Sequence, residues 1–173
     1  MKQLMTLAAL ALFVSPALAE DWKVYENPRF GFSVEVPAEG WKELPPPENG
    51  DGQTWRSAND RSTILAWGSN ILDDFKTDAA QRVASDSDSG WAITADMGWN
   101  MDLKDGPGGW HVYSATLDGR MIQQKSLVAC GGTIAVHVRL EHFESDIGEI
   151  LPMSDRLISS LKAPSGEACG AMQ

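Results

Sequence analysis

The pairs Asp118-Gly119 and Gly131-Gly132 divide residues 110–141 into three runs of alternating apolar and polar side chains. Both pairs accept the positive φ angles that two-residue hairpin loops require. Strands joined by such short loops can only pair in the antiparallel direction, because a parallel connection needs a long crossover. The segment is therefore predicted to be an antiparallel meander, and the rest of the chain must fold around it.

Turns of two residues also fix the register, because a slip of one residue would move every side chain to the other face of the sheet. His111 then faces Ser126, and Ser126 faces His137. The next row on this polar side holds Tyr113, Gln124 and Arg139. The opposite, more apolar side carries Trp110, Val112, Leu127, Val136 and Val138. The meander is thus predicted to have one polar face and one apolar face.

Alternation of apolar and polar residues predicts further strands elsewhere in the chain. One covers residues 30–36, and two more, at residues 53–57 and 62–69, are joined by a short turn. The most regular alternation lies in residues 91–102, whose apolar side consists of Trp91, Ile93, Ala95, Met97, Trp99 and Met101. We expect this side, including both tryptophans, to lie in the core.

Two segments show the period of amphipathic helices. The first spans residues 70–85, and its apolar positions are Leu72, Phe75, Ala79 and Val83. The second spans roughly residues 146–162, with the inward positions Ile147, Ile150, Leu151, Leu157, Ile158 and Leu161. Pro152 is expected either to kink this second helix or to mark the start of its regular part.

The order of these elements predicts an α+β fold. Because the helices must bury their apolar sides, we expect an antiparallel sheet packed with helices, an α/β/α-like sandwich. The length suits a single domain, which we assign to residues 20–162. Residues 163–173 follow it as a C-terminal tail rich in Gly and Ala.

The start of this domain resembles a known family. Residues 25–37, Tyr-Glu-Asn-Pro-Arg-Phe-Gly-Phe-Ser-Val-Glu-Val-Pro, are followed by Gly40 and Trp41, and this pattern resembles the opening of PsbP-like domains. The resemblance implies an antiparallel sheet between helical layers. It also implies a binding or accessory role, since members of the family assist photosystem II or bind a small GTPase in nuclear transport. It carries no catalytic residue to this chain.

Residues 1–19 have the pattern of a secretory signal peptide. Lys2 precedes an apolar run at residues 4–14, and Ala17-Leu18-Ala19 forms a small-residue cleavage site. The apolar run is too short to span a membrane, and no cysteine at residue 20 offers a lipid anchor. We therefore expect release into the periplasm, with secretion from the cell as the alternative.

The acidic composition limits the choice of partners. The whole chain has a formal charge of −10, and removal of Lys2 with the signal peptide would leave 13 basic against 24 acidic residues. Such a charge repels phosphates and anionic lipid, so nucleic acid is not expected as a partner. The partner is predicted to be an unknown protein or small molecule.

The two cysteines, Cys130 and Cys169, are predicted to form a disulfide in an oxidising compartment. Cys130 lies at a hairpin tip, and Cys169 lies in the tail, which needs an attachment. The alternative is a pair of free thiols.

Motifs that would indicate chemistry are missing from the sequence. It contains no G-x-S-x-G elbow, phosphate-binding glycine loop, C-x-x-C pair or H-E-x-x-H motif, and no cofactor is predicted. Asp86 and Asp88 resemble the start of a calcium loop, but Met97 stands where the closing glutamate would be. They are weak metal candidates, and a solvated helix end is the favoured interpretation.

Two hypotheses for the function remain. The favoured one is a non-enzymatic binding or accessory protein, for which Trp41 and Trp110, two of the seven tryptophans, are candidates for a partner surface. The alternative is a small hydrolase or ligand-binding enzyme that uses the row of His111, Ser126 and His137. A polar sheet face without catalytic function is the favoured interpretation of that row.

Overall fold

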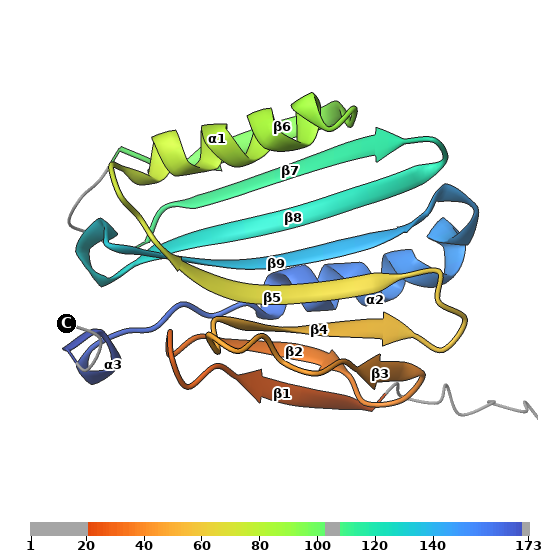
Figure 1. Ribbon diagram of the computed structural model, residues 1–173, viewed down its shortest axis with the longest axis horizontal. Coiled ribbons are helices and arrows are strands. Elements are labelled where there is room, and N and C mark those ends of the chain that lie inside the picture. The colour runs from red at the N-terminus through yellow and green to blue at the C-terminus, as the bar shows by residue number, and fades with distance from the viewer. Residues whose placement is uncertain (1–20, 103–107, 171–173) are drawn as a thin grey trace, which may run out of the picture.

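The computed structural model describes residues 21–102 and 108–170. They form an α+β domain with a two-stranded and a seven-stranded antiparallel sheet (Figure 1). The order in the large sheet is β3-β4-β5-β9-β8-β7-β6. Its strands are β3 (Trp41–Glu43), β4 (Gly52–Ser57), β5 (Thr63–Asn70), β6 (Ala92–Trp99), β7 (Trp110–Leu117), β8 (Arg120–Ala129) and β9 (Ile134–Phe143). The predicted signal peptide and part of the loop before β7 lie outside the described residues.

The predicted register of the meander is confirmed. Leu117 pairs with Arg120 across the first turn, and Ser126 pairs with both His111 and His137. The second turn is wider than the predicted two residues, because the β8–β9 ladder ends at Ala129 and Ile134 and a short 3₁₀ turn (Cys130–Gly132) begins the connection. The widening adds one residue on each side of the glycine pair, so the register is unchanged.

The apolar face of the sheet packs against a helix and a hairpin. Helix α2 (Ile147–Ser160) and the hairpin of β1 (Trp22–Glu26) and β2 (Ser33–Pro37) cover β4, β5 and β9. The core between these layers contains Phe32, Val34, Val36, Trp55, Ile64, Val136, Val138, Leu140, Met153 and Leu157. The predicted strand at residues 30–36 is correct only from Ser33, since Phe30 lies in the preceding turn although it is buried.

Helix α2 continues through Pro152, so the prediction that its regular part begins at this proline is wrong. Ile150 and Leu157 are buried as expected, but Leu151 is 50% exposed and Ile147 is 37% exposed. Met153, which was not predicted to face inward, takes the place of these two residues in the core.

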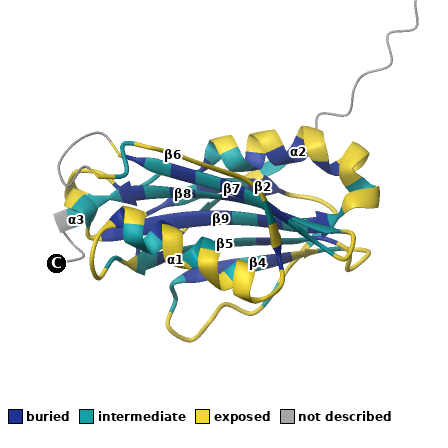
Figure 2. Ribbon diagram, turned by 90° about the horizontal axis from the view of Figure 1, so that it is seen from above, coloured by how far each residue is buried: buried dark blue, intermediate teal, exposed yellow. Residues whose placement is uncertain are grey.

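Helix α1 (Phe75–Asp88) covers the other face of the sheet, and Figure 2 shows α1 and α2 on opposite sides of it. The prediction that this helix begins at residue 70 is wrong. Asn70 ends β5, and Asp74 caps the helix by accepting a hydrogen bond from the Thr77 backbone N–H at 2.8 Å. Leu72, expected on the apolar side, precedes the cap and is 94% exposed.

A β-bulge in β6 overturns the prediction of a single apolar side for residues 91–101. The register with β7 shifts between Ile93 and Ala95, so Thr94 is the extra residue of β6. A bulge of this kind reverses the side to which all following residues point. Trp91 is buried as expected, but Trp99 is 54% exposed and Met97 is 58% exposed.

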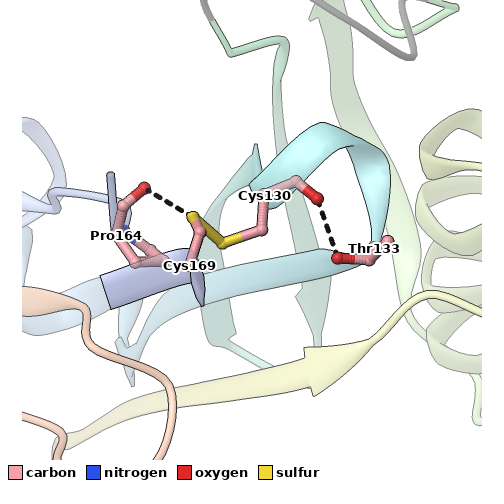
Figure 3. Close-up of a disulfide and its surroundings, with 4 residues drawn as sticks. All are labelled: Cys130, Thr133, Pro164 and Cys169. Carbon is pink, nitrogen blue, oxygen red and sulfur yellow. Dashed lines mark hydrogen bonds between the residues drawn. A yellow bond between two sulfur atoms is a disulfide. The ribbon is translucent and has the colours of Figure 1, made fainter. Parts of the chain in front are cut away.

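The predicted disulfide between Cys130 and Cys169 is present, with a Cα–Cα distance of 5.2 Å (Figure 3). It joins the β8–β9 turn to the short helix α3 (Glu167–Gly170). Thr133 Oγ1 supports the turn by donating a hydrogen bond to the Cys130 carbonyl at 2.8 Å. The C-terminal tail is thereby attached to the end of the sheet.

Replacing both cysteines by serine is expected to lower the free energy of unfolding by roughly 4 kcal/mol, because the disulfide joins residues 39 positions apart and restricts the unfolded chain. Urea unfolding of the oxidised wild type and of the double variant measures this difference. If the two proteins are equally stable, the disulfide that attaches the tail does not stabilise the fold.

Candidate functional site

The predicted row of His111, Ser126 and His137 lies on the sheet face that α1 covers. The Nδ1 atom of His137 is 2.7 Å from Ser126 Oγ. His111 does not extend this hydrogen bond, since its Nε2 atom lies 2.6 Å from Asp96 Oδ1. The structure therefore brings the three residues side by side but divides them into two separate hydrogen-bonded groups.

The hydrogen bonds around His137 are compatible with a neutral imidazole protonated on either nitrogen, because each of its two serine partners can donate or accept. Arg82 donates to Ser69 Oγ at 2.9 Å, so the Ser69 hydroxyl proton is free to point to His137 Nε2, 3.1 Å away. When Ser69 donates to Nε2, neutral His137 carries its proton on Nδ1 and donates a hydrogen bond to Ser126. In this tautomer Ser126 is an acceptor, and His137 cannot take its proton as a general base.

Burial separates His137 from any substrate. Its side chain is fully buried, Ser126 is 1% exposed, and the Trp67 ring stacks on the imidazole at 4.8 Å between ring centroids. Loss of hydration lowers the pKa of His137 well below its ordinary value of 6.5, and electrostatic interaction with Arg82 and His111 lowers it further. The imidazole is thus a neutral part of the interior at physiological pH.

The pairing of His111 with Asp96 depends on the bulge in β6. Beyond Thr94 the even-numbered residues point toward α1, so Asp96 shares a face with Tyr113 and lies next to His111. His111 is 3% exposed, whereas the Asp96 side chain is 52% exposed. Sequence periodicity could not predict this pair, because uninterrupted alternation puts Asp96 on the solvent-facing side of the strand.

The candidate metal residues Asp86 and Asp88 lie in different environments at the end of α1. Asp86 accepts a hydrogen bond from Tyr113 Oη at 2.6 Å and forms an ion pair with Arg139 at 2.8 Å. Asp88 is exposed at the last position of the helix. Within residues 21–102 and 108–170, no group of three or more His, Cys, Asp or Glu is arranged to hold a metal ion. Asp86 and Asp88 therefore stay weak metal candidates, and a helix end without a metal stays the favoured interpretation.

The opposite face of the sheet is only partly covered. Helix α2 and the β1–β2 hairpin lie over β4, β5 and β9, and they leave the same face of β6 and β7 open. One row crosses this face through Trp99, Trp110, Leu127 and Val136, and the next through Met97, Val112, Lys125 and Val138. Both rows therefore run from the core beneath α2 to exposed apolar side chains on the edge strand.

A cleft of about 440 Å³ lies where α2 meets this open region. Its floor includes Trp110, Val112 and Ser114 of β7 with Gln123 and Lys125 of β8, and its wall includes Ser154, Asp155, Ile158 and Ser159 of α2. The volume lies within the range of small-molecule sites, roughly 300–1,000 Å³. The sequence did not predict the cleft, because it depends on where α2 crosses the sheet.

Lys125 links the floor of the cleft to its wall. Its Nζ atom donates a hydrogen bond to the Ile158 carbonyl of the last helical turn at 3.1 Å. A cation at this end of a helix interacts favourably with the helix dipole. Burial lowers the pKa of Lys125 from its ordinary value of 10.5.

The candidate partner residues Trp41 and Trp110 lie near opposite edges of the large sheet. Trp41 begins β3, the edge strand at one side, where it packs against the main core. Trp110 begins β7 beside β6, which is the edge strand at the other side. The two residues therefore do not form one surface, and Trp110 instead pairs with the exposed Trp99.

The sequence matches no protein-family model and no curated protein sequence. Among solved structures, the fold is similar to that of cyanobacterial PsbP (CyanoP) from Synechocystis sp. PCC 6803, with a TM-score of 0.61 and 12% identity over 87% of this chain and 96% of that chain. LpqN of Mycobacterium tuberculosis, described as involved in cell envelope biogenesis, gives a TM-score of 0.46 and 14% identity, covering 83% of this chain and 91% of that one. The chain therefore has a PsbP-like fold, as its opening motif predicted.

The buried state of His137 predicts a dependence of stability on pH. Because folding lowers the pKa of His137, the unfolded chain binds this proton first as the pH falls below about 6.5. The free energy of unfolding should then fall by up to about 1.4 kcal/mol per pH unit, and His137→Gln should remove this contribution.

Urea unfolding of both proteins between pH 7.5 and 5.5 measures the two slopes. If the wild type and the His137→Gln variant lose the same free energy of unfolding over this range, the claim that folded His137 is buried and neutral is wrong.

Proposed function

We propose that this protein is an exported, non-enzymatic accessory protein that binds a partner protein through the edge of its large sheet. The single observation that carries the proposal is the exposure of Met97 and Trp99, which we call the edge patch. Large apolar side chains that continue a core outward to the surface are typical of interaction sites. Because the chain carries a charge of −10, a basic or neutral partner is favoured over an acidic one.

The geometry of β6 supports this choice. Met97 pairs with Val112 and Trp99 pairs with Trp110, so the edge patch continues directly into half-buried apolar residues of β7. Tryptophan is enriched among the residues that contribute most to protein–protein binding. The resemblance to PsbP-like domains also favours an accessory role over an enzymatic one.

Export to the periplasm is part of the proposal. The disulfide between Cys130 and Cys169 supports an oxidising compartment. The signal pattern at residues 1–19, which lies outside the described residues, supports the same assignment. None of the helices in the described part of the chain has the length and apolar character needed to cross a bilayer. Secretion beyond the cell is the alternative location.

The enzymatic alternative has less support. Its nucleophile would be Ser126 with His137 as the base, at a favourable distance of 2.7 Å. Both side chains are buried beneath α1, and His137 can act as the base toward Ser126 only in the tautomer that is protonated on Nε2. A substrate would reach this pair only if α1 moved away from the sheet.

Replacing Met97 and Trp99 together by serine is expected to weaken partner capture at least about ten-fold, since removal of one central aromatic residue commonly costs about 2 kcal/mol in binding. Tagged wild-type protein and this variant are incubated with a periplasmic extract of the source organism, and the captured proteins are quantified by mass spectrometry.

The matched control is Leu72→Ser, which removes an exposed apolar side chain from the loop before α1. We expect this control to capture the same partner protein, in the same amount, as the wild type. Equal capture by the Met97/Trp99 variant would show that the edge patch is not the binding surface.

A further inference from the structure

Lys125 differs from the other unpaired cations of the protein in its environment. Within the described residues, three other basic side chains, Arg29, Lys42 and Lys162, form no ion pair with an acid, and all three are exposed. Lys125 is half-buried at the floor of the cleft. A partly buried charge without a counter-charge is unfavourable, so it favours the approach of an anion.

Lys125 lies at a polar end of the cleft, and apolar residues lie beside it. Val112 faces Lys125 directly across the sheet, and Trp110 and Ile158 add apolar surface to the same cleft. Gln123, two residues before Lys125 on the same face, forms no side-chain hydrogen bond with another described residue, so its amide is available as a donor. The cleft therefore offers one cation and one amide beside apolar walls.

The hydrogen bond of Lys125 to Ile158 leaves room for a second partner. An ammonium group has three donors, and the Ile158 carbonyl accepts one of them. Asp155 is the one acid among the described residues that line the cleft; it is exposed on the wall formed by α2 and forms no ion pair with Lys125. Lys125 therefore has no ion-pair partner within the described residues.

We propose that the cleft binds an anionic amphiphile, namely a medium-chain or long-chain carboxylate. Its head group pairs with Lys125 and accepts a hydrogen bond from Gln123, and its apolar chain lies against Trp110 and Val112 toward the edge patch. The volume of about 440 Å³ suits a small ligand of this kind. This inference concerns a second ligand and does not require the partner protein of the proposed function.

The test compares two probes that share one apolar chain, decanoate and 1-decanol, by titration calorimetry and by the change in tryptophan fluorescence. The negative charge of the whole protein disfavours the anion, so a preference for decanoate must come from a local cation. We expect saturable binding of one decanoate per chain, at least ten-fold tighter than that of 1-decanol. Equal affinities, or the absence of saturable binding, would overturn the proposal.

Lys125→Met keeps an unbranched side chain of similar length and removes its charge. It is expected to weaken decanoate binding at least ten-fold and to change 1-decanol binding less than two-fold. The matched control is Lys42→Met, which removes an exposed lysine from β3 at the opposite edge of the sheet and should leave both affinities unchanged. A Lys125→Met variant that binds decanoate like the wild type would refute the role of Lys125.

A second variant tests the same site without removing Lys125. Val112→Asp places a carboxylate opposite Lys125, where it should pair with the ammonium group and abolish the preference for decanoate. Circular dichroism verifies that each variant is folded, and the preference of the wild type tests the proposal even if a variant does not fold. If the preference is absent while partner capture still depends on Met97 and Trp99, the ligand inference fails and the proposed function stands.

Discussion

The fixed register of β7, β8 and β9 is the constraint on which the rest of the structure depends. Because alternate residues of a strand point to opposite faces, this register sends His111, Ser126 and His137 to one side and Val136 and Val138 to the other. The polar side is then closed by α1, whose Arg82 enters the hydrogen-bond network of His137. The apolar side is closed by α2 over only part of its width. One pairing scheme thus produces both a sealed polar layer and an open apolar face.

The sealed layer and the open face have different physical roles. His137 satisfies both ring nitrogens, through Ser126 and Ser69, whereas His111 Nδ1 and Gln124 Nε2 of the same layer have no hydrogen-bond partner within the described residues. Arg82 and Asp86 of α1 bond to this layer through Ser69 and Tyr113. On the other side, Trp99 leaves about half of its surface in water. Exposed apolar side chains that continue a core outward are typical of interaction sites, and the proposed function uses the open face for this reason.

Sequence periodicity predicted where the strands and helices lie better than it predicted which of their side chains are buried. The hairpin turns fixed the pairing of Ser126 with His137, and the apolar row of Val136 and Val138 lies beneath the terminal helix as expected. The bulge at Thr94 could not be predicted, because alternation in residues 91–101 continues unbroken while the strand itself shifts. The cleft could not be predicted either, since it depends on how far α2 extends across the sheet. The turn signals act locally, whereas these features depend on packing between distant segments.

Nuclear Overhauser contacts across the β8–β9 ladder test the register most directly. In an antiparallel ladder, the Hα protons of facing residues come close at every second pair. The register described here predicts such contacts within the series of Ser126 with His137, Leu127 with Val136 and Val128 with Ala135. A series displaced by one residue, such as Ser126 with Val136, would exchange the two faces and contradict the polar layer, the open face and the cleft together.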